Sequence, residues 1–139
     1  MRIFLDANIL VSVLNKEYPL FSYTARLLSL TRYSQFSLIT SSVCLAIAFY
    51  FAEKKHGTSS ARNKIAILLE HIEVADCGEK EAKMAIQNKQ AHDFEDALQY
   101  YCALHAGCGH IITNDLKDFY FAQIEVLTPE AFLMKYVSQ

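Results

Sequence analysis

The 139-residue chain is 53% hydrophobic and 20% charged, a composition typical of a folded globular protein and unlike that of a disordered chain. Its length predicts one domain, which can bury a core without support from disulfides or metals. Thirteen basic and fifteen acidic residues give a formal net charge of −2, which excludes a protein that holds nucleic acid through bulk positive charge.

Short apolar segments rich in strand formers alternate along the chain with longer amphipathic segments. Strands are predicted over residues 2–5, 36–39, 72–75, 110–113 and 124–127. Helices are predicted over about residues 9–14, 19–33, 43–55, 61–69, 79–88 and 93–106, and a last helix begins at Thr128-Pro129. This alternation predicts one α/β domain over residues 1–139, in which helices cover both faces of a parallel sheet.

Several acidic residues occupy positions that a parallel sheet would bring together. Asp6 directly follows the first predicted strand, Asp115 follows the fourth by two residues, and Asp118 lies three residues further on. Asp93 and Asp96 open a predicted helix three residues apart, so they share one face of it. Ligands of open α/β sheets bind beyond the carboxyl ends of the strands, so these acids are the first candidates for a functional site.

Clustered carboxylates repel one another, and burying them unpaired is costly, so a divalent cation is expected among them. Oxygen ligands without His or Cys favour Mg²⁺ or Mn²⁺ over zinc. Such ions polarise a phosphoryl oxygen and lower the pKa of bound water, which suits phosphodiester hydrolysis. The alternative is that Asp6 and Asp93 only cap helices. Glu95, which lies between Asp93 and Asp96, is predicted to point away from their face as a surface residue.

The cysteines and the apolar segments indicate the compartment. The four cysteines form no CxxC pair, and Cys44 and Cys102 lie in apolar runs, so we expect them to be small buried hydrophobic residues. Asp6 interrupts the first apolar run before a signal peptide could form, and no window approaches the roughly 20 apolar residues of a membrane span. We therefore expect a cytoplasmic protein with reduced thiols and no membrane contact.

Four sequence blocks span nearly the whole chain. They are Phe4-Leu-Asp6-Ala-Asn8-Ile-Leu10, Ser41-Ser42, the segment from Asp93 to Gly107, and Ile111-Ile-Thr113-Asn-Asp115-Leu-Lys-Asp118-Phe119. In this order they resemble the PIN-domain family, the VapC-like or PilT N-terminus-like proteins. The resemblance implies a three-layer α/β/α sandwich, with a mostly parallel sheet of about five strands. It also implies metal-dependent cleavage of RNA.

The resemblance also implies roles for individual residues. Asp6, Asp96 and Asp115 would be catalytic and, together with Asp118, would hold Mg²⁺ or Mn²⁺. Four further positions would support the acids or touch phosphate, namely Asn8, Ser42, Asp93 and Thr113. The chain departs from the family at one position, because Ile47 stands where a Glu usually lies on the helix after the serines. This chain therefore resembles a branch that lacks the helix carboxylate.

Three functions follow from these features. The first is a metal-dependent endoribonuclease, the toxin of a toxin–antitoxin pair, with RNA as substrate, an antitoxin protein as partner and a homodimer as its assembly. The second is a catalytically weakened PIN fold that acts as an RNA- or protein-binding module, because Ile47 cannot bind a metal. The third, ranked lower, is a metal-dependent phosphatase or a flap-type DNA nuclease, since the chain lacks the helical insertions expected for threading a flap.

Overall fold

The computed structural model describes residues 1–137, and strands alternate with helices along that part of the chain. The strands are β1 (Arg2–Leu5), β2 (Ser37–Ser41), β3 (Glu73–Ala75), β4 (His110–Ile112) and β5 (Glu125–Leu127). The α-helices are α1 (Ala7–Asn15), α2 (Phe21–Ser29), α3 (Ser42–His56), α4 (Thr58–Leu69), α5 (Glu79–Gln87), α6 (Phe94–His105) and α7 (Pro129–Tyr136). Two short 3₁₀ helices complete the order, η1 (Leu30–Arg32) and η2 (Leu116–Phe119). Each predicted strand and helix is thus confirmed, with boundaries shifted by a few residues.

The five strands form one sheet in the order β3-β2-β1-β4-β5, and all neighbouring strands are parallel. The chain runs from β1 to one side of the sheet through β2 and β3, and later returns to the other side through β4 and β5. The carboxyl ends of β1 and β4 therefore mark the switch point at which ligands bind in such sheets. Leu5 pairs with Ile112, so Asp6 and Thr113 are the next residues at this edge.

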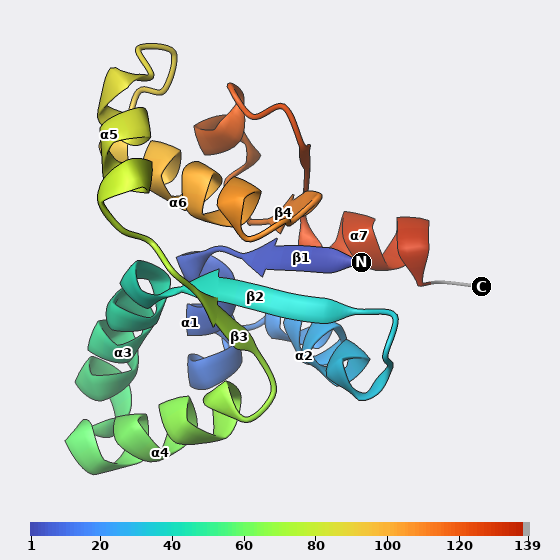
Figure 1. Ribbon diagram of the computed structural model, residues 1–139. Coiled ribbons are helices and arrows are strands. Elements are labelled where there is room, and N and C mark those ends of the chain that lie inside the picture. The colour runs from blue at the N-terminus through green and yellow to red at the C-terminus, as the bar shows by residue number, and fades with distance from the viewer. Residues whose placement is uncertain (138–139) are drawn as a thin grey trace.

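Helices cover both faces of the sheet (Figure 1), as the sequence predicts. Helices α1 to α4 lie on one side, whereas α5 and α6 lie on the other. This division follows from the strand order, because right-handed crossovers in opposite directions along a sheet place their helices on opposite faces. The protein is therefore a three-layer α/β/α sandwich. Within residues 1–137, no helix is long and apolar enough to cross a membrane.

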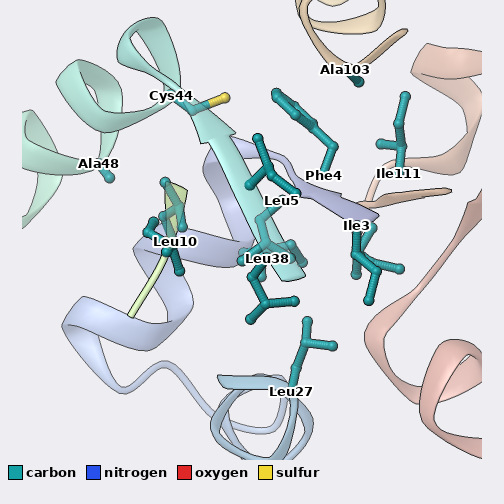
Figure 2. Close-up of a cluster of buried hydrophobic side chains, with 14 of the residues drawn as sticks. Ile3, Phe4, Leu5, Leu10, Leu27, Leu38, Cys44, Ala48, Ala103 and Ile111 are labelled. Carbon is teal, nitrogen blue, oxygen red and sulfur yellow. The ribbon is translucent and has the colours of Figure 1, made fainter. Parts of the chain in front are cut away.

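The central strand β1 anchors the core on both faces of the sheet. Its residues Ile3, Phe4 and Leu5 are fully buried, as expected for a strand of a covered parallel sheet. Successive side chains alternate between faces, and Figure 2 shows Phe4 directed towards Ala103 of α6 while Leu27 of α2 lies on the opposite side of the strand. This packing fixes the strand that carries Asp6 at its end.

The cysteines differ from the expectation of reduced thiols. Cys77, which precedes α5, forms a disulfide with Cys102 of α6, so Cys102 is buried but is not a free thiol. The prediction failed because the two residues are 25 positions apart, and only the packing of α5 against α6 brings their Cα atoms to 5.3 Å. Cys44 and Cys108 are free and buried, and burial raises the pKa of the Cys44 thiol to about 12.

Candidate functional site

A pocket of about 390 Å³ lies beyond the carboxyl ends of β1 and β4, at the switch point of the sheet. We call it the acidic pocket. Its polar walls are Asp6, Asn8, Glu17, Glu95, Asp96, Asp115 and Asp118, and its apolar walls are Ala7, Val11, Ile47 and Phe51. The structure therefore brings together the four acids predicted to hold a metal, from three separate parts of the chain.

Asp6 is the most rigidly held of these acids. It caps the start of α1, where its Oδ1 accepts a hydrogen bond from the backbone N–H of Ala7 at 2.8 Å. Its Oδ2 accepts a hydrogen bond from the Thr113 hydroxyl at 2.8 Å. Asp6 is 9% exposed, and this burial raises the pKa of its carboxyl, while the two hydrogen bonds oppose the rise. Helix capping and a place in the pocket are therefore compatible, not alternatives.

Asn8 and Thr113 link Asp6 to Asp115. The amide Nδ2 of Asn8 lies 3.3 Å from Asp6 Oδ2, 3.1 Å from the Thr113 hydroxyl and 3.2 Å from Asp115 Oδ2, so its two N–H groups are shared among these three oxygens. The Thr113 hydroxyl also accepts a hydrogen bond from the Asp115 backbone N–H at 3.1 Å. One threonine and one asparagine thus fix the spacing of two carboxylates that come from opposite ends of the sequence.

Asp96 enters the pocket from the first turn of α6. Asp93 caps this helix by accepting a hydrogen bond from the Glu95 backbone N–H at 2.8 Å, so Asp93 positions the turn that carries Asp96. The pKa of Asp96 is raised to about 7, first by burial and then by the negative charges of Asp118, Asp93 and other nearby acids. The carboxylates of this pocket therefore interact unfavourably with one another.

Two acidic wall residues were not predicted from the sequence. Glu95 is exposed, as expected, but it also lines the pocket, and its negative charge raises the pKa of both Asp6 and Asp96. The prediction of a surface residue is confirmed, but it did not anticipate the pocket, because a first-turn residue beside a cleft can line it without being buried. Glu17, which follows α1, lines the pocket as well, and no sequence pattern marked it.

The two serines lie where α3 begins, whereas Ile47 lies within that helix. Ser41 is buried and caps α3 by accepting from the Cys44 backbone N–H at 3.0 Å, while its hydroxyl donates to Gln99 Oε1 at 2.6 Å. Ser42 is exposed and does not line the acidic pocket, so the structure does not bring it to the other predicted residues. Ile47 does line the pocket, one helical turn before Phe51. The wall formed by α3 is therefore apolar.

The chemistry of the walls suits a hard divalent cation. The polar lining is dominated by carboxylate oxygens, and among residues 1–137 no Lys or Arg lines the pocket. As the side chains are arranged, however, no three His, Cys, Asp or Glu residues of the described chain are close enough to hold one ion together. The carboxylate oxygens of the pocket are suitable ligands for a metal such as Mg²⁺. In the present arrangement, however, these acidic side chains are further apart than the ligands of a formed metal centre.

Comparisons with known proteins agree with this arrangement. The model of the PIN domain matches residues 2–117. The chain belongs to the PIN-domain family. It is 32% identical over 138 residues to the ribonuclease VapC1 of Aquifex aeolicus, a match that covers 94% of this chain and 92% of that protein. This PIN-domain chain is therefore VapC-like.

Solved structures show the same fold. VapBC-1 from nontypeable Haemophilus influenzae has a TM-score of 0.71 at 20% identity, and the match covers 94% of this chain and 99% of that chain. A toxin–antitoxin complex from Klebsiella pneumoniae has a TM-score of 0.66 at 20% identity, covering 91% of this chain and 97% of that chain. The acidic pocket thus lies in a PIN fold of the size found in these proteins.

Proposed function

We propose that this PIN protein is a metal-dependent endoribonuclease that hydrolyses RNA phosphodiester bonds. Its catalytic residues would be Asp6, Asp96 and Asp115, and these with Asp118 would hold Mg²⁺ or Mn²⁺. The observation that carries the proposal is the set of carboxylates around one pocket whose walls, within residues 1–137, contain no basic residue. Burial first, and then the neighbouring negative charges, raise the pKa of Asp96 to about 7. Similarity to the ribonuclease VapC1 over nearly the full chain supports RNA as the substrate.

Hydrogen bonds from neighbouring groups fix two of the carboxylates in the acidic pocket. Thr113 and the Ala7 backbone N–H hold Asp6 in one orientation, and Asn8 holds Asp6 and Asp115 together through its amide. The chemistry that a divalent cation supplies when bound is neutralisation of these charges, polarisation of a phosphoryl oxygen and a lower pKa for water. Because no basic residue of the described part of the chain lines the pocket, its walls offer little attraction for phosphate, and RNA binding should be weak without metal.

The central test is RNA cleavage by the purified chain with Mn²⁺ or Mg²⁺, with and without EDTA. Asp6→Asn and Asp115→Asn should each lower the cleavage rate at least about 100-fold, because each removes a ligand of the cation. The matched control is Asp76→Asn, which changes an exposed acid just after β3 that does not line the pocket. Calorimetric titration with Mn²⁺ alone should show weaker binding for both pocket variants and unchanged binding for the control.

Cleavage that persists in EDTA and in both pocket variants would contradict the proposal. Cleavage of single-stranded DNA at the same rate as RNA would favour the DNA nuclease instead. Metal binding and the choice of nucleic acid are tested separately, because the calorimetric titration measures Mn²⁺ binding without any nucleic acid.

A second function is a catalytically weakened PIN fold that binds RNA or protein. The observation that favours it is the apolar wall at Ile47, which leaves α3 without a carboxylate in the pocket. Ile47→Glu should strengthen Mn²⁺ binding, because carboxylate number is one determinant of cation affinity. A cleavage rate that rises at least about tenfold in this variant would show that the native site is impaired.

The partners are also proposed. A small antitoxin protein should bind the chain, because a chain of the same fold occurs in the solved toxin–antitoxin complex from Klebsiella pneumoniae. We further propose a homodimer in the cytoplasm. Light scattering of the purified chain, alone and after co-expression with the product of any adjacent small gene, would test both assemblies.

A further inference from the structure

A second pocket of about 410 Å³ lies between the end of α5, the middle of α6 and the turn after η2. We call it the amide–aromatic pocket. Its walls include four side-chain amides and three aromatic rings, namely Gln87, Asn88, Gln90, Gln123, Tyr100, Tyr101 and Phe121. None of the roles described for the acidic pocket uses these residues.

The amide–aromatic pocket is a neighbour of the acidic pocket, because two segments contribute to both. In α6, Asp96 lines the acidic pocket and Tyr100 lines the second one, four residues or about 6 Å further along the helix. After β4, Asp118 lines the acidic pocket, and Phe121 lines the second one three residues later. A flexible polymer bound at the acidic pocket can therefore reach the second pocket within a short length.

The polar groups of this pocket are uncharged. No Asp, Glu, Lys, Arg or His of the described residues lines it. Asn88 is fixed, since its Nδ2 donates to the Tyr101 phenol at 3.2 Å and its Oδ1 accepts from the Gln90 backbone N–H at 3.0 Å. The side-chain amides of Gln90 and Gln123 are exposed and make no hydrogen bond within residues 1–137. Each thus offers a donor and an acceptor to a ligand.

The aromatic side of the pocket is pre-organised. The Tyr100 ring packs edge-on against Tyr101, with centroids 5.1 Å apart, and against Phe121, with centroids 5.3 Å apart. Tyr100 is buried, and its phenol oxygen accepts a hydrogen bond from the Gln123 backbone N–H at 3.3 Å. Tyr101 and Phe121 are partly exposed, so part of each ring is available to a planar ligand.

We propose that the amide–aromatic pocket binds an unpaired nucleobase of the RNA whose backbone lies at the acidic pocket. Planar, uncharged rings that carry paired donors and acceptors are what such walls recognise, because aromatic side chains stack on bases and amides bond to their edges. A phosphate group does not suit the pocket, since no cationic side chain of residues 1–137 lines it. This inference rests on the proposed function, and it assigns the sequence preference of cleavage to residues outside the acidic pocket.

The first test uses cleavage of a pool of RNA hairpins with randomised loops in Mn²⁺, followed by sequencing of the products. The wild type should prefer one or two bases at a fixed position near the cut. The double variant Gln90→Ala/Gln123→Ala should lose at least about fivefold of that preference, while cleavage of the least favoured loops stays unchanged. Gln35→Ala, an exposed glutamine in the loop before β2, is the matched control. A flat wild-type profile, or an unchanged profile in the double variant, would overturn the proposal.

The second test does not depend on catalysis. In Asp6→Asn protein without metal, adenosine, guanosine, cytidine and uridine are each titrated while the side-chain NH₂ signals of Gln90 and Gln123 are followed by NMR. At least one nucleoside should shift both signals, and ribose 5-phosphate should shift neither. Shifts with ribose 5-phosphate alone, or with no probe, would overturn the nucleobase pocket. Failure of the endoribonuclease proposal is recognised separately, by Asp6→Asn leaving RNA cleavage intact.

Discussion

Replacing Asp96 by Asn is expected to stabilise the metal-free protein at pH 8. Burial and neighbouring acids raise the pKa of Asp96 from 3.8 to about 7, and the side chain makes no hydrogen bond within residues 1–137 that the change would remove. This rise corresponds to an upper bound of about 4 kcal/mol against the charged form. Asp96 is only half-buried, so screening by solvent reduces that bound to about 1–2 kcal/mol.

The loss of a favourable first-turn carboxylate subtracts roughly 0.5 kcal/mol from the gain. A net gain of about 1 kcal/mol should raise the Tm by about 3 °C in a domain of this size. The assay is thermal unfolding followed by circular dichroism in EDTA, with Asp76→Asn as the control. Because the pKa is raised in the folded state, the folded protein retains a proton that the unfolded chain releases, so stability falls as pH rises from about 4 to 7. The advantage of the variant should therefore shrink at pH 4. A lower Tm than wild type at pH 8, or an equal gain at pH 4, would refute the reasoning.

Three further changes test other parts of the structure. Thr113→Val should lower the free energy of unfolding by about 1–3 kcal/mol, because it removes the buried hydroxyl that donates to Asp6. Urea unfolding measures this loss, and Thr113→Ser should restore most of the lost stability. The chain unfolded without reductant should expose two reactive thiols, and four reactive thiols would contradict the Cys77–Cys102 pairing. Reduction of this disulfide should lower the free energy of unfolding by about 3 kcal/mol, again measured by urea unfolding. Phe4→Ala should cost about 3–5 kcal/mol, and a loss below 1 kcal/mol would show that β1 does not anchor the core.

The order of elements was predictable because local patterns determine it. Apolar runs of strand formers and capped amphipathic segments alternate, and each occurs in the structure near its predicted position. The position of Asp6 was predictable for the same reason, since an acid directly after a strand must lie at the carboxyl edge of a parallel sheet. Long-range pairing was less accessible. Nothing local to Cys77 or Cys102 indicates that α5 and α6 bring them together.

The sequence alone also could not determine which way the side chains at the starts of helices point. Ser41 and Ser42 are equivalent as caps in the sequence, and only the end of β2 at Ser41 makes the first of them the buried cap. Glu95 was placed in solvent from its spacing to Asp93 and Asp96, but exposure and pocket lining coexist in a first turn. The amide–aromatic pocket could not be predicted, because its walls come from three separate segments, at the end of α5 and just beyond it, within α6, and after η2.

The hydrogen bond between Asp6 and Thr113 joins residues 107 positions apart. During synthesis the N-terminal part of a chain leaves the ribosome first, so Asp6 emerges long before its partner exists. Until β4 has been made and has docked beside β1, the two halves of the acidic pocket cannot meet. A nascent chain is therefore without an assembled site until β4 has been made and has docked, and the timing of assembly follows directly from the strand order.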